Sequence, residues 1–578
     1  MTLVEALETI NRMNPGFPSA TRVLLACGFT PLHLRTFLHA HLLRRFPQDN
    51  IEILTGLYGD LASNLERACG QPISSAAAVA EWTDLDSRLG IRQLGGWQPE
   101  VFPDILTSVR LSLGRLESAL RRLTAGCPVA LSLPSLPLPP LDLPAGWQAG
   151  AFELDLRQEV AGFAARACSI PELRILNPQR LDALSLQSQR FDAKSELLTG
   201  FPYRLEHAER LAALVASLLH NPSPKKGLIT DLDETCWKGI LGEVGVDGIC
   251  WDLAGHAQLH GIYQQFLHAL AQRGILIGAA SKNDPALVEL AFQRRDIHLP
   301  AESVFPVEAH WRPKSESVAR ILKTWNVGAD AVVFVDDSPM ELAEVQAAHP
   351  GVECLLFPKD DPNALLALLD RLRDLFGKPS LSEADRIRRQ SIRNAGVLQD
   401  LVQAGVASYE KVLKQAEAQI HFSLVTAGGS ARAFELVNKT NQFNLNGRRY
   451  REVEWQNYLR QDGAFLLAVS YKDKFGPLGE IAALLGRKLR DGNLRVDTWV
   501  MSCRAFSRRI EYQCLRYLFQ KFNVDGIVFD WLKTPRNGPL CEFLSSLGTL
   551  EREFRLSRQQ FDAQCPLLFH SVEERACE

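Results

Sequence analysis

The chain has 578 residues, a length that predicts three or four folded cores at roughly 100 to 200 residues per domain. Hydrophobic residues make up 46% and charged residues 23%, with 39 glycines and 31 prolines, which excludes disordered, collagenous and coiled-coil classes. The 64 basic and 67 acidic residues give a formal net charge of -3 without long runs of one sign, so no nucleic-acid partner is expected.

The first part of the chain alternates apolar runs of strand length with helical patterns. This order is typical of a parallel sheet, in which helices connect successive strands. The proline-rich segment from Leu133 to Pro144 is expected to be a loop. The predicted strands are 20–30, 51–59, 76–82 and 128–137, and the predicted helices are 31–46, 103–124 and 205–219.

A domain boundary is predicted at 221–227, where two prolines, an Asn, a Ser and a Gly come together. It separates a first domain, 1–220, from a second, 225–375. The second domain alternates strands and helices with short connections, as a doubly wound parallel sheet requires. The predicted strands are 227–233, 275–282, 303–307 and 331–338, and the predicted helices are 259–273, 285–295, 315–325 and 340–349.

A charged segment of helical period, 376–417, is predicted to link the second domain to a third, 418–578. The third domain is expected to hold a mixed sheet with helices. Its predicted strands are 421–427, 464–472, 479–488, 494–502 and 526–532, with a helix at 507–522 and a short final helix.

Cysteine usage and hydropathy bear on the location of the protein. Twelve cysteines are scattered from Cys27 to Cys577 without a CxxC pair, which favours reduced thiols over a disulfide framework or a zinc site. The N-terminal segment carries acids early, so no secretory signal is expected, and no uncharged apolar stretch reaches the roughly 18 residues of a membrane span. We therefore expect a soluble, cytoplasmic protein.

Polar residues that bear chemistry follow the predicted strands of the second domain. Asp231 and Asp233 follow the first strand, and residues two apart in an extended segment share a face, so both carboxylates can converge on one point. Hard oxygen ligands of this kind favour Mg²⁺. Ser281 with Lys282, Lys314, and Asp336 with Asp337 come at other strand ends or helix starts and can line the same rim.

This order of motifs resembles the haloacid dehalogenase (HAD) superfamily, over 225 to about 375. The resemblance implies an Mg²⁺-dependent HAD-like domain that handles phosphate groups. It implies that Asp231 is the nucleophile and Asp233 the general acid/base. The implied phosphate ligands are Thr235, Ser281, Lys282 and Lys314, and the implied metal ligands are Asp231, Asp233, Asp336 and Asp337.

Five segments carry a narrower resemblance: DLDETCWKGILGEVGVDGI, ASKNDP, HWRPKSESV, FVDDSPMELAEV and NKTNQFNLNGRRY. They look like those of the FkbH-like family (HAD subfamily IIIC) from polyketide pathways, whose members act with acyl carrier proteins. The glyceryl-transferring kind is the most similar. The resemblance implies transfer of a glyceryl unit from 1,3-bisphosphoglycerate, with loss of phosphate, onto the phosphopantetheine thiol of a carrier.

Cys236 lies three residues after Asp233, where the glyceryl-transferring relatives also have Cys. The resemblance therefore suggests that Cys236 takes up the acyl group as a thioester before it passes to the carrier. The alternative interpretation is a small apolar residue that fills the core, because free Cys is often buried and inert.

The third domain resembles the acetyltransferase (GNAT) fold that binds coenzyme A. A helix start rich in Arg suits a pantetheine phosphate, and the polar segment before it could line a cleft. The alternative for that segment is an Asn-rich turn whose side chains bond to the backbone. The candidate contacts to a carrier or its pantetheine arm are Asn441, Gln442, Asn444, Arg504 and Arg508.

The first domain resembles the SGNH-hydrolase or flavodoxin-like domain that precedes the phosphatase unit in some relatives. Cys27 stands where the hydrolase Ser would be, so we interpret the domain as a noncatalytic docking or structural unit. Asn177, Asp192 and His207 are interpreted as caps or helix-face residues rather than a catalytic triad, since no suitable Ser accompanies them.

Together these patterns predict an α/β multidomain enzyme with three alternatives for its activity. The first is Mg²⁺-dependent glyceryl transfer from 1,3-bisphosphoglycerate, or a similar acyl phosphate, to an acyl carrier protein. The second is a plain phosphatase of a small phosphometabolite, in which Cys236 is a core residue. The third is a noncatalytic scaffold that binds the carrier. Neither a nucleic acid nor a membrane is an expected partner.

Overall fold

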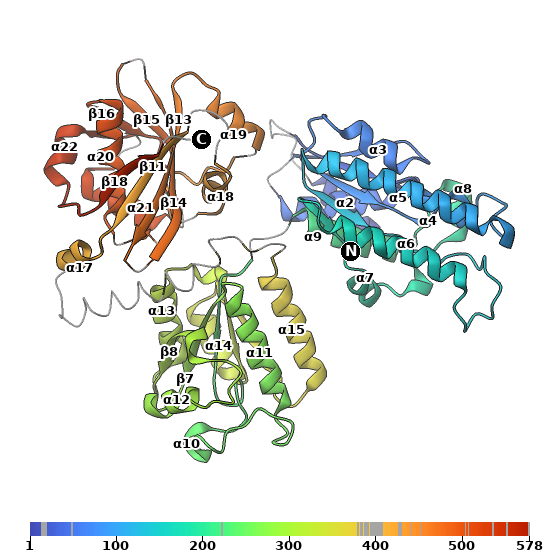
Figure 1. The fold of residues 1–578 in the computed structure, drawn as a ribbon, viewed down its shortest axis with the longest axis horizontal. Coiled ribbons are helices and arrows are strands. Elements are labelled where there is room, and N and C mark those ends of the chain that lie inside the picture. The colour runs from blue at the N-terminus through green and yellow to red at the C-terminus, as the bar shows by residue number, and fades with distance from the viewer. Residues whose placement is uncertain are drawn as a thin grey trace. The chain divides into compact units, whose positions relative to one another are not determined.

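The structure is a computed structural model, and it divides the chain into two compact units, Met1–Pro222 and Ser223–Glu578 (Figure 1). The second unit contains two separate sheets. We call the segment around the parallel sheet, 224–378, the middle domain, and the segment around the mixed sheet, 409–575, the C-terminal domain. The structure describes residues 1–12, 20–47, 50–220, 224–378, 381, 385, 392, 409–425, 430–440, 442–450, 452–474, 476–489, 491–502, 505–506, 508–534, 537–550 and 553–575.

Five parallel strands form the sheet of the N-terminal unit, in the order β2-β1-β3-β4-β5. This is a doubly wound order in which the chain reverses direction across the sheet between β1 and β3. Side chains alternate between the two faces: Leu24 and Ala26 enter one core, whereas Val23 and Leu25 enter the other. The strands are β1 (Ala20–Ala26), β2 (Asn50–Thr55), β3 (Ser75–Val79), β4 (Val129–Ser132) and β5 (Leu173–Ile175).

Helices cover both faces of this sheet. The helices that enclose one core are α3, α5 and α6, and those that enclose the other are α1, α2 and α9. The helices are α1 (Leu3–Asn11), α2 (Leu32–Arg45), α3 (Leu61–Ala68), α4 (Trp82–Leu85), α5 (Phe102–Thr124), α6 (Ala151–Ala167), α7 (Pro178–Leu184), α8 (Ala193–Thr199) and α9 (Leu205–Leu219).

The middle domain is a second parallel sheet, in the order β10-β9-β6-β7-β8. If the strands β6 to β10 are numbered 1 to 5 and the sheet is read from β8, the order is 3-2-1-4-5, which is a doubly wound order. The direction in which the chain crosses the sheet reverses between β6 and β9. The strands are β6 (Gly227–Thr230), β7 (Leu276–Ser281), β8 (Val304–Ala309), β9 (Val332–Asp336) and β10 (Glu353–Leu356). The helices are α10 (Leu241–Val244), α11 (Gln258–Gln272), α12 (Pro285–Phe292), α13 (Lys314–Trp325), α14 (Pro339–Ala348) and α15 (Pro362–Phe376).

The C-terminal domain has a mixed, mostly antiparallel sheet in the order β17-β16-β15-β14-β13-β11-β18, with β12 paired to β15. Parallel pairs join β15 to β16 and β11 to β18. The strands are β11 (Gln419–Val425), β12 (Phe443–Asn444), β13 (Ala464–Asp473), β14 (Gly476–Lys488), β15 (Leu494–Met501), β16 (Gly526–Phe529), β17 (Phe554–Ser557) and β18 (Ser571–Arg575). The helices are α17 (Tyr409–Gln415), α18 (Ala431–Lys439), α19 (Glu452–Leu459), α20 (Ile510–Phe522), α21 (Gly538–Leu547) and α22 (Arg558–Gln564).

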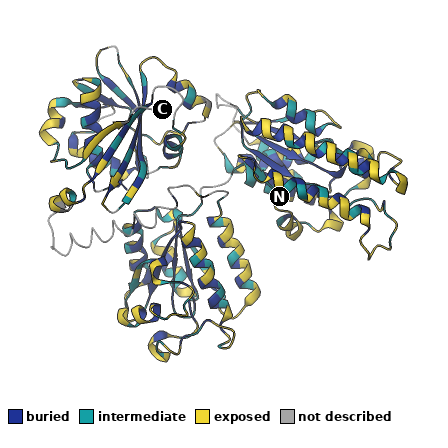
Figure 2. Ribbon diagram, in the orientation of Figure 1, coloured by how far each residue is buried: buried dark blue, intermediate teal, exposed yellow. Residues whose placement is uncertain are grey.

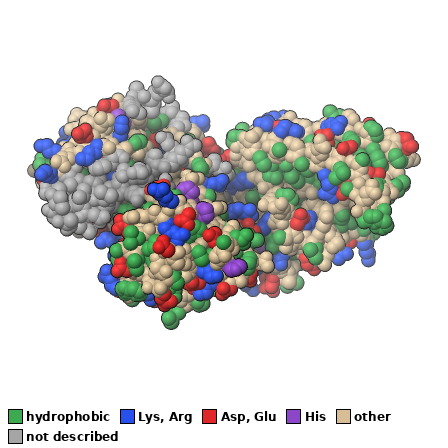
Figure 3. Space-filling model, turned by 60° about the horizontal axis from the view of Figure 1, so that its bottom comes forward, with side chains coloured by type: hydrophobic (Ala, Val, Ile, Leu, Met, Phe, Trp, Pro, Cys, Tyr) green, Lys and Arg blue, Asp and Glu red, His purple; other side chains and the backbone are tan. Residues whose placement is uncertain are grey.

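Burial follows the layers of each domain. The strands are mostly buried, and the outer faces of the helices are exposed (Figure 2). On the face seen in Figure 3, basic and acidic side chains are interspersed, in keeping with the balanced charge of the chain. Among the helices that the structure describes, none is both long and apolar enough to cross a membrane.

The predicted α/β class with parallel sheets is confirmed, and α9 has the predicted bounds. Neither α6 nor β5 was predicted, and β5 has only three residues, too few to form a recognisable apolar run. Most of the predicted helical linker, 376–417, lies outside the described residues. The proposed likenesses to SGNH and GNAT folds stay predictions.

Candidate phosphate and metal site

The candidate site lies where the strand order of the middle domain reverses. Asp231 directly follows β6, and Asp336 is the last residue of β9, the neighbouring parallel strand. The carboxyl ends of parallel strands meet at one edge of a sheet, and open α/β sheets bind ligands at the point of reversal. The topology therefore brings these two carboxylates together, although they are far apart in the sequence.

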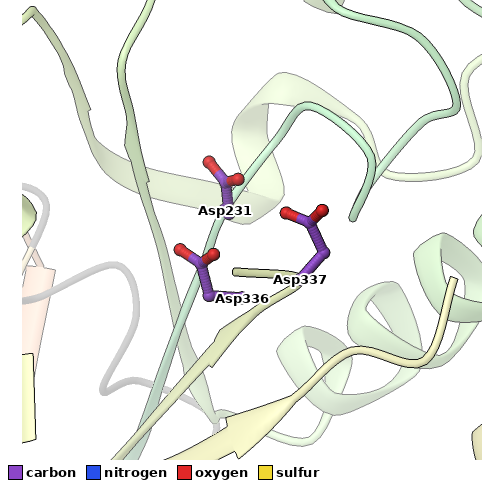
Figure 4. Close-up of side chains that lie close together, drawn as sticks. All are labelled: Asp231, Asp336 and Asp337. Atoms are coloured by element: carbon purple, nitrogen blue, oxygen red, sulfur yellow. The ribbon is translucent and has the colours of Figure 1, made fainter. Parts of the chain in front are cut away.

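Asp337 joins them to form a group of three carboxylates. One oxygen from each of Asp231, Asp336 and Asp337 lies within 4.8 Å of the others, so the group could hold a metal ion (Figure 4). Asp231 and Asp336 are buried, and burial raises the pKa of each carboxyl above its ordinary value. A divalent cation would offset the free-energy cost of burying these carboxylates and would reduce their mutual repulsion. An all-oxygen ligand set suits Mg²⁺.

Lys314 is the buried cation of the site. It is the first residue of α13, and its Nζ lies 3.0 Å from Oδ1 of Asp231 and 2.6 Å from Oδ2 of Asp336. Burial alone would lower the pKa of this ammonium group, but the two carboxylates outweigh that effect and raise the pKa well above its usual range. Lys314 is therefore held as a cation beside the candidate nucleophile.

Glu341 forms ion pairs with two lysines of the site, and it was not among the predicted site residues. Its carboxylate contacts Nζ of Lys314, and its Oε1 lies 2.8 Å from Nζ of Lys282. The residue stands three positions after Ser338, which caps α14, and a Glu there usually belongs to a helix cap. In the structure Asp336 Oδ1 accepts the Ser338 N–H at 2.8 Å instead, which leaves Glu341 free to bind both lysines.

Asp233 lies beside this group but is not one of the three clustered carboxylates. Its Oδ1 accepts a hydrogen bond of 2.9 Å from Trp237 Nε1, and its Oδ2 accepts bonds from the Leu241 N–H at 3.2 Å and from Asn283 Nδ2 at 2.9 Å. Burial raises the pKa of Asp233 above the ordinary range for Asp. An oriented carboxyl with a raised pKa is suited to proton transfer. Its predicted role as a metal ligand stays a prediction.

Ser281 ends β7 and is buried, with its hydroxyl 3.2 Å from Nδ2 of Asn283. Asn283 thus links Ser281 to Asp233, a role that was not predicted. The sequence offered little indication of this role, because an Asn just before Asp284 and Pro285, where α12 begins, is typical of a turn. Lys359, which was not among the predicted site residues, has its Nζ 2.9 Å from Oδ2 of Asp337.

Thr235 and Cys236 are both buried in the loop after β6. The Thr235 hydroxyl has no hydrogen-bond partner among the residues that the structure describes. The sulfur of Cys236 lies 3.6 Å from the Thr230 hydroxyl and belongs to the apolar core under α11, and burial raises the pKa of the thiol to about 12. This environment opposes formation of a thiolate, so the geometry favours the interpretation of Cys236 as a core residue.

Two of the five candidate carrier contacts, Asn444 and Arg508, bond to other residues of the C-terminal domain. Asn444 is buried, donates to the Thr440 carbonyl at 2.9 Å and accepts the Gly447 N–H at 2.7 Å. Arg508 is buried, and its Nε lies 3.5 Å from Oδ2 of Asp473. Gln442 is half-buried, and Asn441 and Arg504 lie outside the described residues. These contacts of Asn444 fit the alternative interpretation, an Asn-rich turn whose side chains bond to the backbone.

In the N-terminal unit, Asn177 and Asp192 cap α7 and α8, as predicted. His207 is buried in α9, but, contrary to expectation, a serine does accompany it: Ser135 Oγ lies 3.1 Å from His207 Nε2. Burial lowers the pKa of His207 to about 3. Cys27 is also buried, and burial raises the pKa of its thiol far above the usual range.

No family model and no curated protein matches the chain. Among solved structures, it is similar to the N-terminal part of protein BF1531 from Bacteroides fragilis, which contains a phosphatase domain and was crystallised with Mg. The identity is 21% and the TM-score 0.50, over 66% of this chain and 100% of that one, a likeness of fold. An uncharacterized protein from Corynebacterium glutamicum matches 27% of this chain and 98% of its own, with 14% identity and a TM-score of 0.19, too low to support any inference.

Proposed function

We propose that the middle domain is an Mg²⁺-dependent phosphatase of the HAD type. The observation that carries the proposal is the group of three carboxylates, Asp231, Asp336 and Asp337, with Lys314 paired to two of them at the point of strand reversal. The similarity in fold to a phosphatase-containing structure that was crystallised with Mg supports it.

In the first step, a carboxylate oxygen of Asp231 attacks the phosphorus of the substrate. A new O–P bond forms, the P–O bond to the leaving group breaks, and the leaving oxygen takes a proton from Asp233. Oδ1 of Asp233 accepts one hydrogen bond, from Trp237, and keeps a lone pair for that proton. Lys314, Lys282 and the hydroxyls of Ser281 and Thr235 supply positive charge and donors for the phosphoryl oxygens.

In the second step, Asp233 removes a proton from water, and the resulting oxygen attacks the aspartyl-phosphate. Inorganic phosphate leaves and the Asp231 carboxylate is restored. Bound by Asp231, Asp336 and Asp337, Mg²⁺ would neutralise charge on the phosphoryl group. Glu341 keeps Lys314 and Lys282 in place through both steps.

Phosphate release from acetyl phosphate tests this proposal. We expect turnover that requires Mg²⁺, stops with EDTA and is lost in Asp231→Asn. Asp370→Asn, on the exposed face of α15, is the matched control and should keep full activity. Turnover that persists in Asp231→Asn would reject Asp231 as the nucleophile.

The second candidate function is glyceryl transfer to an acyl carrier protein, and the five motif segments support it. In that reaction a carrier thiolate would attack the acyl carbon of 1,3-bisphosphoglycerate, forming a C–S bond as the C–O bond to phosphate breaks. The remaining phosphate ester would then be hydrolysed through Asp231. Because Cys236 is buried with a raised pKa, the carrier thiol is a better acceptor than Cys236.

The mass of a phosphopantetheinylated carrier protein separates the candidates. After incubation with the enzyme, Mg²⁺ and 1,3-bisphosphoglycerate, glyceryl transfer predicts a gain equal to an unphosphorylated glyceryl group. Phosphate release without a change in carrier mass supports the plain phosphatase. Carrier binding without any turnover supports the scaffold alternative, in which Gln442 and its neighbours in the C-terminal domain would make the contact.

A further inference from the structure

Trp237 lies in the loop after β6, and its indole ring is fully buried in the core of the middle domain. The ring packs edge-to-face against Phe292 of α12, with ring centroids 5.9 Å apart. Its polar atom, Nε1, donates a hydrogen bond of 2.9 Å to Oδ1 of Asp233. A buried indole N–H usually has such a partner, and here the partner is the candidate acid/base of the proposed phosphatase.

The backbone around Trp237 is fixed as well. The Trp237 N–H donates to the Leu232 carbonyl at 3.2 Å, and Asp233 and Trp237 form a parallel bridge. Lys238 and Cys250 exchange two backbone hydrogen bonds, of 2.9 and 3.2 Å, which hold the chain directly after Trp237. Because packing fixes the ring and hydrogen bonds fix the backbone, the indole N–H points in one direction. Trp237 can therefore determine where Oδ1 of Asp233 lies.

The two oxygens of Asp233 differ in the hydrogen bonds that they accept from the described residues. Oδ2 accepts two, from the Leu241 N–H at 3.2 Å and from Asn283 Nδ2 at 2.9 Å, whereas Oδ1 accepts the one from Trp237. A carboxyl oxygen has two lone pairs, so Oδ2 is filled and Oδ1 keeps one position for a proton. The proton that the acid gives to a leaving group is therefore carried on the oxygen to which Trp237 donates.

We propose that Trp237 is a positioning residue for the general acid: its indole N–H holds Oδ1 of Asp233, the oxygen that carries the proton, in place for the leaving group. This inference rests on the proposed phosphatase function and deepens it. As the P–O bond breaks, its electron pair stays on the leaving oxygen, and the proton on Oδ1 moves to that oxygen. Phosphate esters of alcohols need this proton, because an alkoxide is a poor leaving group, whereas an acyl phosphate releases a stable carboxylate. Trp237 therefore suits the site to phosphate esters of alcohols.

The ratio of kcat/KM for two substrates of the full chain tests this proposal. Glycerol 2-phosphate has an alkoxide leaving group and acetyl phosphate a carboxylate, and kcat/KM reports the steps up to the departure of the leaving group. Trp237→Phe keeps an aromatic ring but removes the N–H. We expect it to lower kcat/KM for glycerol 2-phosphate about tenfold to a hundredfold more than kcat/KM for acetyl phosphate, since only the alkoxide needs the acid. A purely structural role would lower both values equally.

Trp325→Phe is the matched control, because Trp325 is also buried in the middle domain and its Nε1 donates to the Phe305 carbonyl at 2.7 Å. Its ring packs against Gly227 at the start of β6, whereas Asp231 follows the end of that strand. The control variant loses the same N–H and the same ring area, and it should leave the ratio of the two kcat/KM values unchanged. Equal losses for both substrates in Trp237→Phe, or the same change of ratio in both variants, would overturn the proposal. Absence of Mg²⁺-dependent turnover of either substrate by the parent protein would instead reject the proposed function, and this inference with it.

A spectroscopic measurement with Trp237 in place decides the matter if Trp237→Phe does not fold. In ¹⁵N-labelled protein each indole N–H gives its own resonance, and the resonance that disappears in Trp325→Phe belongs to Trp325. Asp233→Ala removes the acceptor of the Trp237 N–H. We expect it to shift one indole resonance other than that of Trp325, whose acceptor is the Phe305 carbonyl. If Asp233→Ala shifts no indole resonance, then Trp237 does not hold Asp233 and the proposal is wrong.

Discussion

Asn283 Nδ2 lies 2.9 Å from Oδ2 of Asp233 and donates a hydrogen bond to it, joining the end of β7 to the loop after β6. We therefore expect Asn283→Ala to lower kcat for phosphate release about tenfold to a hundredfold, the effect of one hydrogen bond to a charged group. KM should change little, because Asn283 acts by orienting Asp233. Steady-state kinetics with acetyl phosphate measures this. Asn363→Ala, at the exposed start of α15, is the control, and equal kcat in the two variants would show that Asn283 does not position Asp233.

Lys314 balances two buried carboxylates, so its removal should cost stability. Replacing one partner of a buried ion pair typically destabilises a protein by about 3 to 5 kcal/mol, and we expect a loss of this order for Lys314→Met without a divalent ion. Mg²⁺ should restore part of the lost stability by neutralising Asp231 and Asp336. Chemical denaturation with Mg²⁺ or with EDTA measures both effects.

The control for this experiment is Lys323→Met, an exposed position on the same helix. It should leave stability within about 0.5 kcal/mol of the parent protein. If Mg²⁺ stabilises Lys314→Met no more than it stabilises Lys323→Met, then Lys314 and the metal do not share the same carboxylates.

Cys236 should resist alkylation in the folded protein. Burial raises the pKa of its thiol to about 12, so below that pH the group is protonated and unreactive as a nucleophile. At pH 8, iodoacetamide should label the exposed Cys168 and leave Cys236 unlabelled until the protein is unfolded. Peptide mass spectrometry measures both sites. Labelling of Cys236 as fast as Cys168 would instead support its role as an acyl-carrying thiol.

Gly227 packs directly under Trp325, where a Cβ atom would lie 2.4 Å from the indole ring. We expect Gly227→Ala to destabilise the middle domain by about 1 to 3 kcal/mol through overpacking. Gly242→Ala is the matched control, because a Cβ there meets nothing within 4 Å. Thermal unfolding of the two variants measures the difference, and equal Tm values would contradict the packing of β6 against α13.

The position of the acidic site could be predicted from sequence because it follows from strand order. Asp231 and Asp336 both come at the ends of apolar runs, and the carboxyl ends of parallel strands share an edge. Glu341 and Asn283 could not be assigned in the same way, since both stand where helix starts commonly carry polar residues.

Burial and long-range pairing were the features that the sequence did not reveal. The environment of Cys236 depends on Tyr263 and Gln264 of α11: Gln264 Nε2 donates to the Cys236 carbonyl at 2.7 Å, and both side chains are buried. Likewise, β18 pairs with β11 although about 150 residues separate them in the chain, a contact that no local pattern encodes.

The aspartyl-phosphate itself is the most direct test of the central claim. Acid-quenched enzyme that has reacted with acetyl phosphate and Mg²⁺ can be reduced with borohydride, which converts an aspartyl-phosphate to homoserine. We predict homoserine at position 231, detected in the peptide by mass spectrometry, and no conversion in the presence of EDTA. Active turnover with Asp231 unmodified, or with homoserine at Asp233, Asp336 or Asp337 instead, would contradict the proposed mechanism.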